Sequence, residues 1–173
     1  MKTRRQKAQN DGIRLRGFFR VRLVEYDAET HAAHIVGDSG WVPNQVVDLG
    51  RRDYLCTPLA GGAAKSIALM ALGTGGAPAA SATSLAGELS HSTAGTRNRL
   101  TVATSQIGSS AIEFQATFAS SISFATTTAN ISNIMVINNT TSAGTIFAGN
   151  TYTSSLLNTN QDVQASYRIN FAT

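Results

Sequence analysis

The stretch VQASYRINF at residues 163–171 alternates between apolar and polar side chains from beginning to end. Successive side chains of a β-strand point to opposite faces of the sheet, so one face of this strand would be apolar and the other polar. The stretch SAIEFQATFA at residues 110–119 shows the same alternation. Both segments are therefore predicted to be half-buried strands. The side chains predicted to lie between two sheets are Phe114, Phe118, Tyr167, Ile169 and Phe171.

More strands are predicted toward the N-terminus. GFFRVRLVEY at residues 17–26 alternates as well, and a turn at residues 27–30 leads into a returning strand at residues 31–36. A short helix is predicted within residues 50–60, stopped by Pro58. Apolar runs predict further strands at residues 66–72, 131–137 and 145–152. About seven or eight short strands joined by polar turns predict an all-β fold, an antiparallel β-sandwich of Ig-like or jelly-roll-like type.

The composition describes one domain with an unusual surface. Hydrophobic residues make up 42% of the 173 residues, enough for a core. Charged residues make up only 14%, against about 25% in typical soluble domains, so Ser, Thr and Asn must supply much of the polar surface. The single cysteine, Cys56, excludes an internal disulfide framework and is expected to be a small buried hydrophobic residue. We expect neither a membrane-spanning helix nor a secretory signal, because no apolar run is long enough and none follows the basic N-terminus.

Positive charge is concentrated at the N-terminus. Residues 1–22 hold eight of the fourteen Lys and Arg, opposed only by Asp11, and so carry +7, whereas the rest of the chain carries −3. We predict an extended basic N-terminal arm at residues 1–16 and a β-sandwich domain at residues 17–173. Ordering such an arm costs about 1–2 kcal/mol per residue, so contacts with an acidic or phosphate-bearing partner must offset that cost. The predicted partner-binding residues of the arm are Lys2, Arg4, Arg5, Lys7, Arg14 and Arg16.

One short motif suggests catalysis. Gly37-Asp38-Ser39-Gly40 spells the sequence around the nucleophile of trypsin-like serine proteases. In that fold the catalytic His and Asp lie far upstream, and here only 38 residues precede Ser39. The same four residues also make a good turn, because Gly accepts a positive φ and Asp and Ser hydrogen-bond to nearby backbone. We therefore expect a turn and no protease.

Other candidate sites have structural explanations too. His31 and His34 have the spacing of a helical metal site, but on a strand these two positions face opposite sides, so no metal is expected. The loop Gly73-Thr74-Gly75-Gly76 lacks the Gly-Lys-Ser/Thr that completes a phosphate loop. Paired carboxylates for acid–base chemistry are not evident. The sequence predicts no enzyme and no cofactor.

Two segments together resemble a family of bacteriophage virion proteins. Residues 42–55, VPNQVVDLGRRDYL, are similar to a segment of that family with an asparagine, two apolar residues, then Gly and a short helix. Residues 69–89, LMALGTGGAPAASATSLAGEL, are similar to the segment that follows it, and the final strand at residues 167–171 has the family's aromatic-x-Ile-x-Phe pattern. The resemblance covers residues 17–173 and implies a β-sandwich with a virion structural role, in proteins variously described as tail, fibre or head-associated components. The basic arm is a departure from the family.

Three functions follow as hypotheses. The first is a non-enzymatic phage virion protein that decorates or cements the capsid through contacts with the major capsid protein, as a homo-oligomer without membrane contact. The alternative is a tail, collar or fibre component that binds a receptor or carbohydrate, for which Trp41, Tyr54 and Tyr152 are the only plausible stacking residues. The third, ranked lower, is a nucleic-acid-binding module that uses the arm and the shared strand face of Arg20 and Arg22.

Overall fold

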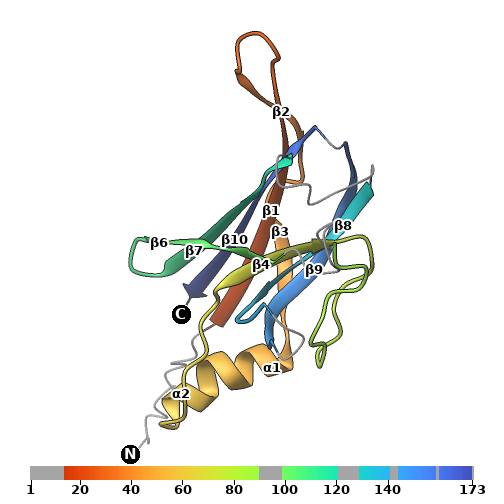
Figure 1. Cartoon of the computed structure of the whole chain (residues 1–173). Coiled ribbons are helices and arrows are strands. Elements are labelled where there is room, and N and C mark those ends of the chain that lie inside the picture. The colour runs from red at the N-terminus through yellow and green to blue at the C-terminus, as the bar shows by residue number, and fades with distance from the viewer. Residues whose placement is uncertain (1–13, 90–98, 121–128, 141–143, 159, 173) are drawn as a thin grey trace, which may run out of the picture.

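A computed structural model describes residues 14–89, 99–120, 129–140, 144–158 and 160–172 (Figure 1). Ten antiparallel strands and one short helical segment make up the described chain, which confirms the predicted all-β class with a single short helix. The strands are β1 (Arg14–Tyr26), β2 (Ala33–Asp38), β3 (Val42–Val46), β4 (Leu69–Gly73), β5 (Leu100–Thr101), β6 (Ala103–Ile107), β7 (Ala111–Phe118), β8 (Ala129–Ile137), β9 (Ile146–Leu157) and β10 (Asp162–Ala172).

The strands form two layers joined at both seams into a nearly closed sheet. The order is β5-β4-β8-β9-β3-β1-β10-β7-β6, with β2 pairing on β1. At one seam, β3 pairs with β1 over its first residues and with β9 over its last ones. At the other, only Val102 separates β5, which pairs with β4, from β6, which pairs with β7. Closing a sheet in this way removes edges that would otherwise pair with other chains.

The apolar faces of the predicted alternating strands meet in an aromatic core. In β10, Tyr167 pairs with Phe19 of β1 on one side and with Phe114 of β7 on the other. The ring centroids lie 4.5 Å and 6.2 Å from that of Tyr167, and all three side chains are buried. Phe118 and Ile169 are buried as predicted, at 1% and 5% exposure.

The prediction for Phe171 was wrong, because its side chain is 37% exposed. Phe171 is the penultimate residue of β10, beyond its last pairing with β7 at Asn170, so no neighbouring strand covers it from that side. The predicted alternation of the strand was correct, but the alternating sequence continues past the last residue of β10 that β7 covers.

The helical segment was predicted at residues 50–60 and lies at residues 48–59, as α1 (Asp48–Arg51), a π-helical turn (Arg52–Cys56) and α2 (Thr57–Leu59). Pro58 does not stop it but lies within α2, and the helix ends one residue later. The Thr57 N–H donates to the Arg52 carbonyl, five residues earlier. This wide turn directly precedes the proline, whose ring would clash with the carbonyl four residues back in a regular α-helix.

Sheet residues around β4 and β8 are buried on both faces. A second cluster of buried side chains lies on the face of β4, β8 and β9 away from the main core, and includes Val47, Leu69, Ala71, Leu85, Met135, Ile137 and Ile146. This explains why β4 and β8 are continuous apolar runs without alternation. Cys56, predicted to be buried, is exposed, so the helix turns that position away from the core. In the described part of the chain, no helix has the length and hydropathy needed to span a membrane.

Candidate interaction surface

The hairpin formed by β1 and β2 projects beyond the two layers at the end of the molecule opposite the helix (Figure 1). Its turn is fixed by Asp27, whose Oδ1 accepts hydrogen bonds from the backbone N–H of Thr30 at 2.7 Å and of Glu29 at 3.0 Å, and from the Thr30 hydroxyl at 2.8 Å. These bonds, those from Thr30 first, lower the pKa of Asp27. His31 completes the turn with a φ of 54°, in the left-handed region. A defined turn therefore presents the end of the hairpin.

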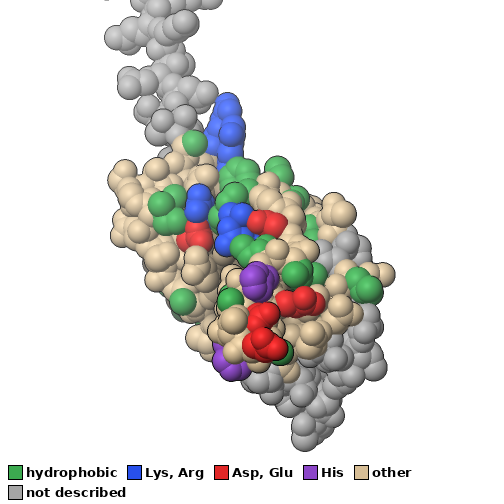
Figure 2. Space-filling view, turned by 90° about the horizontal axis from the view of Figure 1, so that it is seen from above, with side chains coloured by type: hydrophobic (Ala, Val, Ile, Leu, Met, Phe, Trp, Pro, Cys, Tyr) green, Lys and Arg blue, Asp and Glu red, His purple; other side chains and the backbone are tan. Residues whose placement is uncertain are grey.

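The hairpin tip, residues 25–36, combines apolar and acidic side chains. Tyr26, Ile35 and Val36 are 48%, 57% and 50% exposed. The tip holds three carboxylates and no Lys or Arg. Figure 2 looks onto this end of the molecule and shows carboxylate and histidine side chains gathered in one area, with a group of basic side chains beside it. Among the described strands, β2 pairs only with β1, so its outer edge carries no strand.

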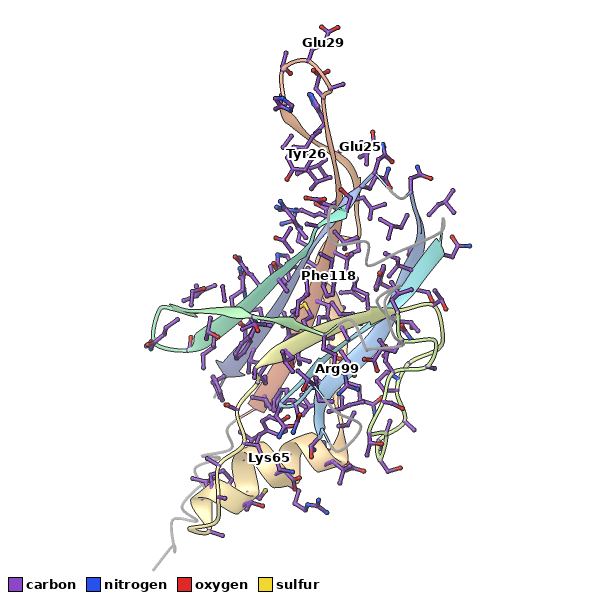
Figure 3. All side chains as sticks on the ribbon, in the orientation of Figure 1. Glu25, Tyr26, Glu29, Lys65, Arg99 and Phe118 are labelled. Atoms are coloured by element: carbon purple, nitrogen blue, oxygen red, sulfur yellow. The ribbon has the colours of Figure 1, made fainter. Side chains whose placement is uncertain are left out.

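Cross-strand pairing sorts these side chains between the two faces of the hairpin. Tyr26 lies two residues after Val24 and so on the same face of β1, and Ile35, the cross-strand partner of Val24, shares that face. Glu25 and its cross-strand partner His34 lie on the other face. Figure 3 shows Tyr26 and Glu25 on either side of the hairpin base and Glu29 at its end. The Glu25 carboxylate accepts a hydrogen bond from Gln161 at 2.7 Å, and the Asp162 carboxylate raises the pKa of the Tyr26 phenol. One face of the hairpin therefore carries the Glu25 carboxylate, while Tyr26 on the other face lies near the Asp162 carboxylate of β10.

The base of the hairpin is held by two arginines on one aspartate. Arg20 donates from Nε and Nη2 to Asp38 at 3.0 and 2.5 Å, and Arg22 Nε lies 3.3 Å from the same carboxylate. The hydrogen bonds from Arg20, helped by the Gly40 N–H, hold the pKa of Asp38 at about 2, against 3.8 ordinarily. The two arginines that the sequence assigned to a shared strand face are thus on one face and share one partner.

Ser39 completes the turn that the Gly-Asp-Ser-Gly motif was expected to make. Its Oγ accepts a hydrogen bond from the Val21 N–H and donates one to the Gly40 backbone carbonyl, each at 2.9 Å. Gly40 has a φ of 64° and also donates its N–H to Asp38. His31 lies outside β2, at the turn, while His34 lies within it. No group of three or more metal-ligating side chains occurs within the described residues.

A polar groove lies on the outer face of β1, β10 and β7, next to the hairpin. It encloses about 320 Å³, and its polar lining consists of Arg20, Arg22, Gln115, Thr117, Gln164 and Ser166. Farther along the same face, the Arg168 guanidinium lies 4.4 Å from the ring centroid of Trp41 and donates to Glu113 at 2.6 and 2.9 Å. The groove thus has a cationic wall, four neutral hydrogen-bonding side chains and an aromatic ring nearby.

An apolar recess occupies the end of the molecule away from the hairpin. It has a volume of about 330 Å³ and is lined mainly by hydrophobic side chains, including Leu15, Ile67, Ile112 and Phe171. Lys65 at its margin is held by Asp53 at 2.5 Å and by Thr145 at 2.7 Å. Arg52 and Lys65 keep the pKa of Asp53 at about 2. The ammonium group of this lysine is therefore already engaged.

The structure describes two of the six basic residues predicted to form the arm. Arg14 and Arg16 lie in β1, where they pair with Ala172 and Asn170 of β10, so they belong to the sheet and not to an extended arm. Lys2, Arg4, Arg5 and Lys7 lie outside the described residues. The sheet therefore includes the last residues that the sequence assigned to the arm.

Only part of the predicted stacking set is accessible. Tyr152 is buried at 8% exposure, and the Tyr54 hydroxyl donates to the Thr145 carbonyl at 2.5 Å. Trp41 is half-buried against Arg168. The most exposed aromatic ring on the described surface is Tyr26, which the sequence pattern did not single out as a contact residue.

No protein-family model matches the chain, and no curated protein and no solved structure matches it.

Proposed function

We propose that this protein is a non-enzymatic structural component of a bacteriophage virion, attached to the capsid as a decoration or cement protein. In this proposal it forms a homo-oligomer, binds the major capsid protein through protein–protein contacts, and acts in the virion without a cofactor. The observation that carries the proposal is the projecting hairpin, whose tip exposes Tyr26, Ile35 and Val36 beyond a nearly closed sheet. An element of this kind suits contact with a neighbouring subunit, since exposed apolar side chains gathered at one place mark interaction sites.

The rest of the surface supports the same proposal. Charged residues make up only 14% of the chain. Subunits packed among many neighbours bury much of their surface, and burying few charges avoids their desolvation cost. Strand β6 illustrates this surface, because its Ala-Thr-Ser-Gln-Ile sequence is exposed throughout. The resemblance of residues 17–173 to phage virion proteins points in the same direction.

The number of copies in each particle tests the proposal. Purified particles of the encoding phage would be analysed by quantitative mass spectrometry, with the major capsid protein as the internal reference. Hundreds of copies would support decoration of the shell, whereas about three to eighteen would support a collar, tail or fibre position, as expected from the symmetry of those assemblies. Absence of the protein from particles that are otherwise complete would refute a structural role.

A truncated chain tests the part assigned to the N-terminus. Deleting residues 1–10 leaves every strand of the described sheet intact, so the protein should stay folded and soluble but attach poorly to particles. Attachment of the full chain should also weaken with salt, because exposed charges are screened within about 8–10 Å at moderate ionic strength. Undiminished attachment of the truncated chain at both low and high salt would show that the body alone makes the contact.

One observation favours a second candidate, a tail, collar or fibre component that binds a glycan. The outer groove brings Arg22, Gln115 and Gln164 together, and Trp41 lies on the same face. Amide and guanidinium groups beside an aromatic ring can bind sugars, particularly acidic ones. Screening the full chain on immobilised bacterial surface glycans, with Gln164→Ala as the matched variant, would test this; binding that the variant retains would place the glycan elsewhere.

A further inference from the structure

We propose that the hairpin tip, residues 25–36, binds the basic N-terminal segment, residues 1–13, of a second copy of this chain. This inference deepens the proposed function, because it names the contact that would build the homo-oligomer. It rests on the proposed function only for the expectation that the protein forms a homo-oligomer. The contact would join opposite ends of neighbouring molecules.

The two segments are complementary in charge. The hairpin tip carries Glu25, Asp27 and Glu29 without any Lys or Arg, a formal −3. Residues 1–13 carry Lys2, Arg4, Arg5 and Lys7 against Asp11, a formal +3. Opposite potentials on two surfaces steer their encounter and fix their register.

The hairpin also offers contacts that suit arginine and lysine in particular. Long basic side chains bury their aliphatic stems on apolar surface while the charged group stays solvated, and Ile35 and Val36 provide such surface. A guanidinium also stacks favourably on an exposed aromatic ring, and Tyr26 provides one next to negative charge. The three carboxylates of the tip would be a poor match for an acidic partner.

Glu29 is the carboxylate most available to a partner. Within the described residues its side chain takes part in no hydrogen bond or ion pair, and only its backbone N–H belongs to the turn. By contrast, Asp27 holds the turn together and Glu25 accepts from Gln161. Charge reversal at Glu29 therefore alters the surface while leaving the hairpin's own hydrogen bonds in place.

The path of β1 favours a contact between molecules. The strand begins at Arg14 beside the helix and ends in the hairpin at the far end (Figure 1). At a rise of about 3.3 Å per residue, its thirteen residues separate these two ends by roughly 40 Å. Both edges of β1 are already paired, one with β10 and the other with β3 and then β2, so no free edge leads the segment back to its own hairpin.

Sedimentation of two complementary variants tests the proposal. The first is Glu29→Lys, which reverses charge at the hairpin. The second combines Arg4→Glu with Arg5→Glu, which reverses charge in the N-terminal segment. Each variant alone should self-associate about five- to tenfold more weakly than the parent chain at low salt. Mixed together, they should form a one-to-one complex, because the intact segment of the first can bind the intact hairpin of the second.

The control is Asp48→Lys, the same type of charge reversal at an exposed carboxylate in α1, far from the hairpin. It should self-associate like the parent. Association of the parent should also fall at least about fivefold between 0.05 and 0.5 M salt.

Three outcomes would overturn the contact: a parent chain that stays monomeric at about 100 μM, variants that associate as well as the parent, or a mixture that forms no complex. Loss of association on nuclease treatment would also overturn it, because nucleic acid would then be the ligand of the basic segment. All of these measurements use purified protein. They can therefore fail while the protein is still found in virions, and they can succeed if it is not.

Discussion

The guanidinium of Arg99 donates to both carboxylate oxygens of Glu88, from Nε at 2.7 Å and from Nη2 at 3.1 Å. The side chains are only 0% and 6% exposed, so this ion pair is buried. Nη1 of Arg99 also donates to the Asn139 carbonyl at 2.8 Å. One side chain therefore ties the start of β5 to two loops that are distant in the sequence.

Replacing Arg99 with Met should lower the free energy of unfolding by about 3–5 kcal/mol, because it removes a buried cation from beside the buried Glu88 carboxylate. Chemical denaturation would measure the loss. The matched control is Arg51→Met, which removes an exposed partner of Asp48 and should cost no more than about 1 kcal/mol. Equal losses in the two variants would mean that Glu88 reaches water in the native state.

Phe114 and Phe171 make a second contrast, since the sequence assigned both to the core and the structure buries only Phe114. Truncation of Phe114 to Ala should cost about 3–5 kcal/mol, because a cavity would open beside Tyr167. Truncation of Phe171, which is 37% exposed, should cost less than half as much. Denaturant melts of both variants would decide, and a neutral Phe114→Ala would contradict the strand phasing described above.

Gly50 brings the helix against β9. A Cβ at this position would lie 2.1 Å from the carbonyl oxygen of Phe147, a contact that only backbone movement could relieve. We expect Gly50→Ala to destabilise the protein by at least about 2 kcal/mol, even though alanine favours helix formation. Gly76→Ala is the control, because nothing lies within 4 Å of its Cβ position. Thermal unfolding of the two variants should therefore differ clearly.

Asp38 should make stability depend on pH in the acid range. Its pKa is about 2 in the folded chain, against an ordinary value of 3.8, chiefly because of the hydrogen bonds from Arg20. A carboxylate with a lowered pKa stabilises the fold above its unfolded pKa, and this contribution disappears as the pH falls from about 4 through 2. Asp38→Asn should thus be less stable than the parent at pH 7 and nearly equal to it near pH 2. A difference that stays constant over this range would show that the Asp38 charge contributes nothing.

Much of the fold was predictable because its strands bury one face. The alternating pattern in β1, β7 and β10 arises because one face is buried, and the apolar runs of β4 and β8 arise because both faces are buried. Strands β6 and β3, which were not predicted, show no such burial pattern in their sequences. Strand β6 is exposed along its whole length, so its sequence has no apolar period. Strand β3 contains Pro43 and changes partner from β1 to β9 after three residues, so it never builds a pattern of its own.

The candidate surface was less predictable than the fold. The sequence revealed the basic N-terminal segment but gave no weight to Glu25, Asp27 and Glu29, which lie within five residues of one another. That acidic cluster was a usable signal. The projection of the hairpin was not, because it depends on where β10 and β3 stop alongside β1, and pairing between distant segments sets those points.

The long pairing of β1 with β10 has a mechanical consequence. Eleven residue pairs join the two strands, from Arg14–Ala172 to Val24–Asp162. A pull on Arg14 of β1 and on Asn160, just before β10, acts along the strand axes in opposite directions, while the hydrogen bonds lie across them. Because the two strands are pulled in opposite directions, such a load shears all of the bonds together and cannot open them one after another. Single-molecule stretching from Arg14 and Asn160 should accordingly record one abrupt rupture rather than gradual yielding, and a subunit held at these two points would resist extension until the whole pairing breaks.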